Sequence, residues 1–291
     1  MRKFLVDFLD RFDYPEEAKE ALVSCYDAMA ADEGAAAVMN KHIDIYAAGG
    51  DYKHYEMLAE TTTEALRIGK PWQTAHLVMV ILLSKYLLER YAAKGIDEQR
   101  WIDIVDDFKC KLFECHNVYH IWGSFLCNWW EQKLSMNIFG VGRFQYQMKP
   151  FGREYKDENI HLTPDMKALS IHIPSSGPLT KELREKSYKM AKEFFAPYFG
   201  DQQALFMCSS WLLYPENEEM IPGSNIVDFM HDFKVFEVFE PEKSNDLWRI
   251  FGDACVLPYE LLPRNNSLRR AYASRLCEGK KVGLGIGFFV R

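Results

Sequence analysis

Residues 168–180, Ala-Leu-Ser-Ile-His-Ile-Pro-Ser-Ser-Gly-Pro-Leu-Thr, decide the fold of the second half of the chain. Residues 168–173 are mostly apolar and predict a buried strand, which Pro174 ends because proline cannot donate to a ladder. Small residues follow as far as Thr180. After them, apolar residues recur at helical spacing at Tyr188, Ala191, Phe194 and Phe195. The stretch therefore predicts a strand, a loop of small residues and the N-terminus of a helix.

This strand–loop–helix unit has two interpretations. The exposed N–H groups and the positive dipole end of the helix suit an anion, and serine and glycine let phosphates come close. Alternatively, the loop is an ordinary turn in which Pro178 begins the helix and a serine or threonine caps it. The loop contains neither a Walker lysine nor a G-x-G-x-x-G pattern, so it does not indicate ATP or NAD.

The rest of the second half continues the mixed pattern. Short aromatic or β-branched runs predict strands at 141–148, 204–213 and 235–240. Helical stretches are predicted at 180–195, from Glu216 onward and at 268–277. Near the end, glycine alternates with apolar residues from Lys281 to Phe289, which predicts a strand with one bare face. Close internal packing is the favoured cause of that bare face.

The first half is helical throughout. Glycines and prolines separate segments in which apolar residues recur every three or four positions. The predicted helices begin after Pro15 and continue at 35–48, 52–68, 72–93, 98–120 and 125–134, a bundle of roughly six. The domains predicted are residues 1–136 and 137–291. The fold class is α+β, with the N-terminal bundle packed on a mixed α/β domain, because no low-complexity linker separates them.

Charge and composition narrow the function. The 291 residues carry 35 Lys or Arg and 42 Asp or Glu, a net charge of −7. Residues 1–136 hold 15 basic and 22 acidic residues, so the whole excess of acid lies there and a nucleic-acid surface is not expected. The seven cysteines form no C-x-x-C pair. With no apolar leader after Met1 and no run that could span a bilayer, we expect a cytoplasmic protein that does not bind membranes.

A metal site is not expected either. His116 and His120 are four residues apart on a predicted helix, a spacing that can place two imidazoles on one metal. Aromatic residues crowd the region and no H-E-x-x-H pattern is present. Two structural histidines are the favoured interpretation, and the same holds for His172 on its strand.

Four short motifs carry a resemblance to a known family: Phe139-Gly-Val-Gly-Arg-Phe-Gln145, Ile171-His-Ile-Pro174 with Gly177-Pro-Leu179, Ser210-Trp-Leu-Leu213 and Ser224-Asn-Ile226. By these motifs the chain resembles a family of bacterial N-acyltransferases that have a helical N-terminal domain and a GNAT-like C-terminal domain. The order of strands and helices after residue 168 resembles that of the conserved half of the GNAT fold. The likeness extends over nearly the whole chain.

This resemblance implies that acyl-CoA, such as acetyl-CoA, is the co-substrate. Its pyrophosphate would lie on the loop from Pro174 to Thr180, and its pantetheine arm between the strands ending near Ile173 and beginning near Ala204. The superfamily pattern [QR]-x-x-G-x-[GA] is replaced there by a loop with one glycine. The cofactor-binding residues implied are Ile173, Ser175, Ser176, Gly177, Leu179 and Thr180.

The resemblance also implies the reaction: an amine of a small molecule or peptide attacks the thioester directly, with no metal. Tyr214 is the predicted proton donor to the leaving thiolate, and Glu216 or Glu218 the base that takes the amine proton. The three lie where a predicted strand gives way to a helix, and a solvated acidic helix start explains the glutamates equally well. The alternative function is a non-catalytic ligand-binding or protein-interaction module on a degenerate GNAT scaffold.

Overall fold

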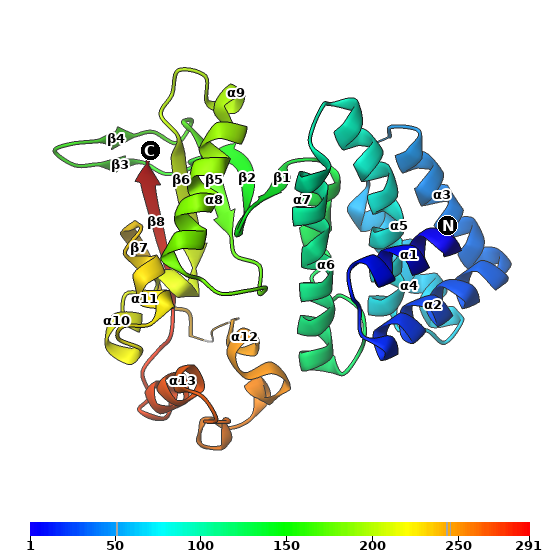
Figure 1. Cartoon of the computed structure of the whole chain (residues 1–291). Helices are drawn as coiled ribbons and strands as arrows, with labels where there is room; N and C mark the ends of the chain where they lie inside the picture. Colours follow the sequence, from blue (N-terminus) through cyan, green and yellow to red (C-terminus); the bar gives the residue numbers. More distant parts are fainter. Residues whose placement is uncertain (51, 243, 245) are drawn as a thin grey trace. The chain divides into compact units, whose positions relative to one another are not determined.

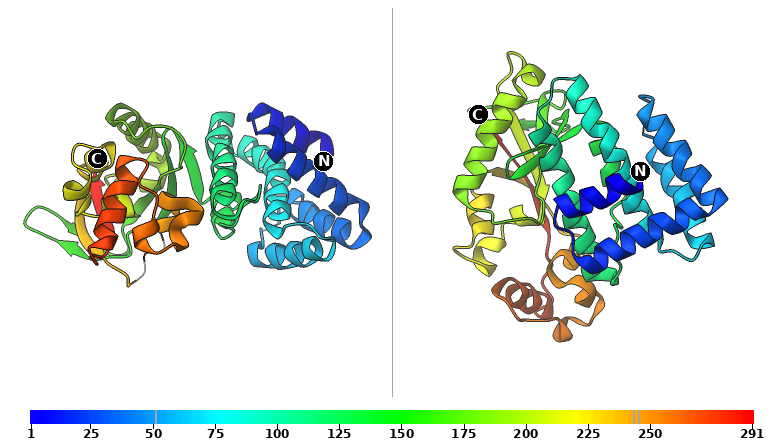
Figure 2. Two further views of the ribbon diagram at one scale, coloured as in Figure 1. Left: turned by 90° about the horizontal axis from the view of Figure 1, so that it is seen from below. Right: turned by 45° about the vertical axis from the view of Figure 1, so that its right-hand side comes forward.

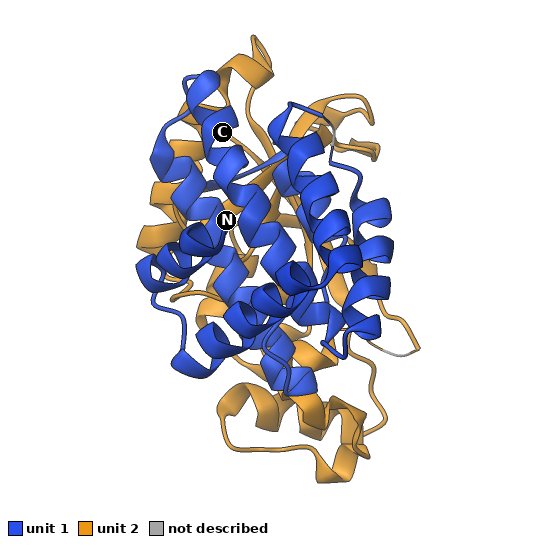
Figure 3. Cartoon of the chain, turned by 90° about the vertical axis from the view of Figure 1, so that its right-hand side faces the viewer, with its two compact units in different colours: residues 1–140 blue, residues 141–291 orange. Residues whose placement is uncertain are grey.

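Figure 1 shows the structure, a computed structural model that describes residues 1–291 except 51, 243 and 245. The chain forms two compact units, Met1–Gly140 (unit 1) and Val141–Arg291 (unit 2), which Figure 3 colours separately. The sequence analysis sets the corresponding division after residue 136.

Unit 1 is a helical bundle, as the periodicity predicts. Residues 74–84 of its longest apolar helix are buried without interruption. One helix at the N-terminus was not predicted, although its apolar residues Leu5, Phe8 and Leu9 follow helical spacing and are buried. The last helix begins later than the predicted residue 125. The helices of unit 1 are α1 (Arg2–Arg11), α2 (Glu16–Ala31), α3 (Glu33–Ala47), α4 (His54–Arg67), α5 (Trp72–Ala93), α6 (Glu98–Tyr119) and α7 (Trp129–Leu134).

Within the residues that the structure describes, no helix combines the length and the apolar character needed to cross a bilayer.

Unit 2 contains the last five strands of a six-stranded sheet with the strand order β1-β2-β5-β6-β8-β7. Only β5 and β6 pair in parallel among the described pairings, and β2–β5, β6–β8 and β7–β8 are antiparallel. The mixed sheet confirms the predicted α+β class. The strands of this sheet are β1 (Ile138–Val141), β2 (Phe144–Pro150), β5 (Lys167–His172), β6 (Leu205–Ser210), β7 (Lys234–Phe239) and β8 (Leu284–Val290).

Helix α8 (Lys181–Phe194) lies across one face of the sheet (Figures 1 and 2), and aromatic side chains pack it there. The Tyr188 ring lies 5.4 Å from the ring of Phe144 and 4.8 Å from that of Phe289. A separate apolar cluster contains Leu162, Met207 and Phe288. Leu162 belongs to the hairpin of β3 (Tyr155–Lys156) and β4 (His161–Leu162).

Shorter elements complete unit 2. The predicted strand 204–213 ends at Ser210, and a single 3-10 turn, η1 (Trp211–Leu213), follows it. The predicted helix at 268–277 is present, whereas α11 and α12 were not anticipated. These elements are α9 (Ala196–Phe199), α10 (Asn217–Met220), α11 (Asn225–Met230), α12 (Leu247–Phe251), η2 (Gly252–Val256), η3 (Tyr259–Leu261) and α13 (Ser267–Cys277).

The glycines of β8 confirm the prediction of close internal packing. A Cβ atom added to Gly285 would lie 2.1 Å from the carbonyl oxygen of Leu213, and one added to Gly287 would lie 2.9 Å from Cβ of Phe233. Real Cβ atoms do not approach other atoms so closely, so η1 can lie against β8 only because the strand has no side chain at these two positions.

Candidate functional site

The pairing between β5 and β6 stops before either strand ends. In the described part of the chain, their register joins Leu169 to Phe206 and Ser170 to Met207, and no further pair. However, β5 runs on to His172 beside β2, and β6 runs on to Ser210 beside β8. The described ladder between the two parallel strands therefore ends before their carboxyl ends, and backbone groups beyond it need another partner.

The predicted phosphate loop begins directly after His172, the last residue of β5. Helix α8 begins at Lys181, so Pro178 is not its first residue as the turn interpretation predicts. Thr180 is the N-cap residue, but its side chain makes no capping hydrogen bond. The first helical bond runs from Arg184 N–H to Thr180 O at 3.1 Å, so the N–H groups of residues 181–183 point out of the helix without an intrahelical acceptor.

Gly177 gives the loop its shape. Its φ of +69° lies in the left-handed region that glycine adopts without strain, and no heavy atom lies within 4 Å of a Cβ built there. All six predicted binding residues, Ile173, Ser175, Ser176, Gly177, Leu179 and Thr180, lie in this segment between β5 and α8.

Two arginines hold the loop by its carbonyl groups. Arg143, in the turn between β1 and β2, donates to the carbonyl oxygens of Pro174, Gly177 and Pro178. Arg184, from α8, donates to the carbonyl of Leu179 at 3.0 Å. Sequence reasoning missed both roles, because the arginines and their acceptors meet only through the fold.

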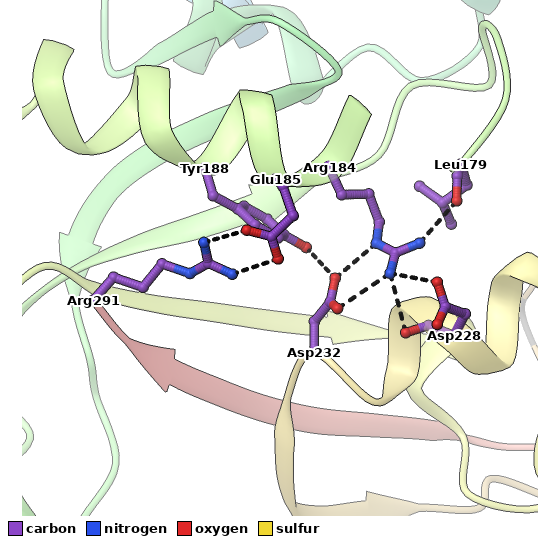
Figure 4. Close-up of polar contacts among 7 residues, drawn as sticks. All are labelled: Leu179, Arg184, Glu185, Tyr188, Asp228, Asp232 and Arg291. Atoms are coloured by element: carbon purple, nitrogen blue, oxygen red, sulfur yellow. Dashed lines mark hydrogen bonds and ion pairs between the residues drawn. The ribbon is translucent and has the colours of Figure 1, made fainter. Parts of the chain in front are cut away.

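Arg184 is the centre of a larger network, shown in Figure 4. Its side chain is completely buried and donates to the carboxylates of Asp228 and Asp232, at 2.8 and 2.7 Å. The Tyr188 hydroxyl also donates to Asp232, at 2.9 Å. These bonds join α8 to α11 and to the turn after it, so they fix the helix whose first turn carries the exposed N–H groups.

Tyr214 and Glu216 meet at Arg275. The Tyr214 hydroxyl donates to Glu240 and accepts from Arg275 at 3.0 Å, and the same guanidinium lies 3.1 Å from Glu216. Burial, together with the hydrogen bond to Glu240, raises the pKa of Tyr214 to about 12. The phenol thus holds its proton at neutral pH, as a proton donor must.

Glu218 does not share this cluster. It is exposed, and its carboxylate lies 3.2 Å from Nε2 of His231 on the surface. The structure therefore brings together two of the three predicted catalytic residues and places the third in a different ion pair.

His172 is a candidate that sequence reasoning set aside as structural. It ends β5, where the pairing with β6 has stopped, and its Nε2 lies 3.2 Å from Oε1 of Gln147 on β2. This contact orients the imidazole ring at the end of the strand. Gln145, the register partner of His172, is buried with its Nε2 unpartnered, so the same sheet face also carries a donor that can serve a ligand.

The paired histidines of α6 pack against aromatic rings. His116 stacks on Trp122 with ring centres 3.6 Å apart, and the His116 and His120 rings are 6.2 Å apart. Among the residues described, no group of three or more His, Cys, Asp or Glu side chains is arranged to hold a metal ion.

Comparison with family models identifies the class of protein to which this fold and loop belong. Residues 138–289 match the GNAT-like C-terminal domain, and residues 3–136 match the N-acyltransferase N-terminal domain. The chain belongs to this family of acyltransferase-type proteins, as the sequence resemblance implies. None of the curated protein sequences compared with it matches.

Solved structures share the fold over almost the whole chain. One is an acyltransferase in complex with decanoyl-CoA and teicoplanin, with 20% identity, a TM-score of 0.71 and coverage of 98% of this chain and 86% of that one. Another is an acyltransferase mutant in complex with octanoyl-CoA, with 21% identity, a TM-score of 0.70 and the same coverage. At sequence identities this low, the likeness shows a shared fold and nothing further.

Proposed function

We propose that this protein is an acyl-CoA-dependent N-acyltransferase. The observation that carries the proposal is the end of the β5–β6 ladder after Ser170 and Met207, directly before a loop and helix start with outward-pointing N–H groups. Backbone groups beyond the ladder can pair with the amides of a pantetheine arm, and the loop offers donors to phosphate. Family membership and the acyl-CoA complexes of structures with the same fold support this assignment.

We assign the base to His172 rather than to Glu216 or Glu218. Glu216 is held by Arg275, and Glu218 lies beside His231, whereas His172 ends β5 beyond its last pair with β6 and its ring is oriented by Gln147. The amine nitrogen attacks the thioester carbonyl carbon, the C–N bond forms and the C–S bond breaks. The imidazole of His172 takes the amine proton.

Tyr214 supplies a proton to the leaving thiolate in this proposal. Its hydroxyl must release Glu240 to do so, and Arg275, which donates to the same oxygen, stabilises the phenolate that forms. The acceptor class is a primary amine on a small molecule or peptide. The related structures with medium-chain acyl-CoA lead us to propose an acyl group longer than acetyl.

Calorimetric titration of the full chain with acetyl-, octanoyl- and decanoyl-CoA tests the donor. We expect binding of the longer thioesters and release of free CoA thiol when primary amines are added. Binding of acyl-CoA without turnover on any amine would instead support the non-catalytic module. Absence of binding would exclude both the acyltransferase and an acyl-CoA-binding module. His172→Asn should retain binding and lose turnover, and Glu216→Gln and Glu218→Gln serve as its matched controls.

Substitution of Gly177 by a charged residue tests whether the loop binds the phosphates of CoA. Aspartate there should repel the phosphates by roughly 4 kcal/mol if the charges lie ~4 Å apart at an effective dielectric of about 20, on the order of a thousandfold in CoA affinity. Gly177→Asn is the matched control, because asparagine has the same shape and also tolerates a positive φ. Equal affinities of the two variants for CoA would move the phosphates away from this loop.

A further inference from the structure

One guanidinium group spans the predicted phosphate loop. Arg143 Nε lies 2.9 Å from the carbonyl oxygen of Pro178, Nη1 lies 3.1 Å from that of Pro174, and Nη2 lies 3.3 Å from that of Gly177. All three nitrogens of the planar fork therefore donate to backbone carbonyls of one short loop. A lysine has a single nitrogen and no such fork, so it cannot reproduce this arrangement.

These bonds determine which way the loop presents its N–H groups. In a trans peptide the C=O and the following N–H point in opposite directions from one planar unit. With the carbonyls of Pro174 and Pro178 drawn toward Arg143, the N–H groups of Ser175 and Leu179 must point away from it. Pro178 has no N–H, so turning the carbonyl of Gly177 toward Arg143 affects no backbone hydrogen-bond donor.

The second arginine sets the far end of the same loop. Arg184 is buried and draws the carbonyl of Leu179 toward the network of Asp228 and Asp232. By the same planarity, the N–H of Thr180 points away from that network. The loop is thus held at both ends, at one end by a partly exposed arginine and at the other by an arginine in the core.

We propose that Arg143 is a positioning residue for the phosphates of CoA. It acts through the loop: by holding three carbonyls on one side, it arranges the backbone N–H groups on the other side as a preformed anion cradle. The arrangement also takes the place of the second glycine of the superfamily loop pattern, since a guanidinium rather than backbone freedom sets the conformation. The inference rests on the proposed function, because it concerns the same CoA site.

The test compares ligands with and without phosphates. Affinities of wild type, Arg143→Gln and Arg143→Lys are measured calorimetrically for CoA and for decanoyl-pantetheine, which lacks the pyrophosphate. We expect both variants to lose about tenfold to a hundredfold in CoA affinity, the range of one or two charge-assisted hydrogen bonds, and to bind decanoyl-pantetheine as wild type does. In turnover, KM for acyl-CoA should rise while kcat stays near the wild-type value.

Arg153→Gln is the matched control, because Arg153 is an exposed arginine of unit 2 that bonds to Glu237 and to the carbonyl of Gly152. It removes the same charge and should leave CoA affinity unchanged. CoA binding by Arg143→Lys equal to wild type would show that charge alone acts and would overturn the positioning role. Loss of decanoyl-pantetheine binding in step with CoA would overturn it too, as a general structural effect. If wild type binds neither ligand, the proposed function itself fails.

Discussion

Two completely buried side chains, one in each unit, meet the cost of burial in opposite ways. In unit 1, His76 is completely buried and neither ring nitrogen has a hydrogen-bond partner, and Nε2 of its neighbour His54 is also unpartnered. In unit 2, the equally buried Arg184 donates to two carboxylates and a carbonyl. An imidazole can enter a core by giving up its proton, whereas a guanidinium cannot and must be paired.

Unit 1 follows the same rule where it buries an ammonium group. Lys133 is fully buried, and its ammonium donates to Asp107. Burial lowers the pKa of Lys133 to about 8, against the attraction of that carboxylate. The ability to become neutral, rather than the unit in which a group lies, decides how much pairing it requires.

The largest effect is expected from removing the buried guanidinium. Arg184→Leu leaves Asp232 and Asp228 without their cation and should lower the free energy of unfolding by about 3 to 5 kcal/mol, as for other broken buried ion pairs. Urea unfolding of the full chain measures this loss. Arg153→Leu removes an exposed arginine from the same unit and should change stability by about 0.5 kcal/mol or less. Similar losses for the two variants would contradict the conclusion that a buried guanidinium depends on its paired carboxylates.

The second-largest effect on the free energy of unfolding is expected when the pH is lowered. Burial lowers the pKa of His76 from 6.5 to about 3, with a smaller contribution from His54. Between these values the unfolded chain binds the proton and the folded chain does not, so stability is full above pH 6.5 and falls as the pH drops. By pH 4 this residue should account for about 3 kcal/mol of lost stability.

Comparison of urea midpoints at pH 7 and pH 4 measures this loss, and His76→Leu should reduce the dependence by that amount. His161→Gln, which alters an exposed histidine, is the control for the loss of an imidazole. An undiminished dependence in His76→Leu would mean that the imidazole is hydrated or charged in the folded state.

The smallest expected effect is the difference in stability between losing a hydrogen bond to a charged acceptor and losing one to a neutral acceptor in unit 2. Tyr188→Phe removes a donation to the Asp232 carboxylate and should cost about 2 kcal/mol. Tyr146→Phe removes a buried hydrogen bond of 2.8 Å to the Ser187 hydroxyl and should cost about 1 kcal/mol. Urea unfolding ranks the two variants, and the reverse order would show that the Arg184 network does not depend on the tyrosine.

Local patterns in the sequence predicted most of the fold. The helix at Trp72–Ala93 matches its predicted bounds, because glycine and proline mark both ends. The strand 168–173 is present within one residue at each end. Prediction failed at Trp211–Leu213, where an apolar run looks like the rest of a strand. The run turns into η1 because it packs against the bare face of β8, a contact that local pattern does not encode.

The candidate site was less predictable because its groups meet across strands. Loop residues such as Gly177 could be found from composition and from the family resemblance. The bond from Arg143 reaches carbonyls 31 to 35 positions away, and His172 pairs with Gln147 only through the register of β2 and β5. A single sequence does not show which residues lie opposite each other in a sheet, so it gives no signal for the roles of Arg143 and His172.

The glycine-lined face of β8 has an evolutionary consequence. Every codon change that replaces Gly285 adds at least a Cβ, which would lie 2.1 Å from the Leu213 carbonyl and displace the segment that leads to Tyr214. Alanine, the mildest replacement elsewhere, is no exception. Position 285 thus has almost no neutral replacement, and the geometry around Tyr214 depends on a position that contributes no side chain to it.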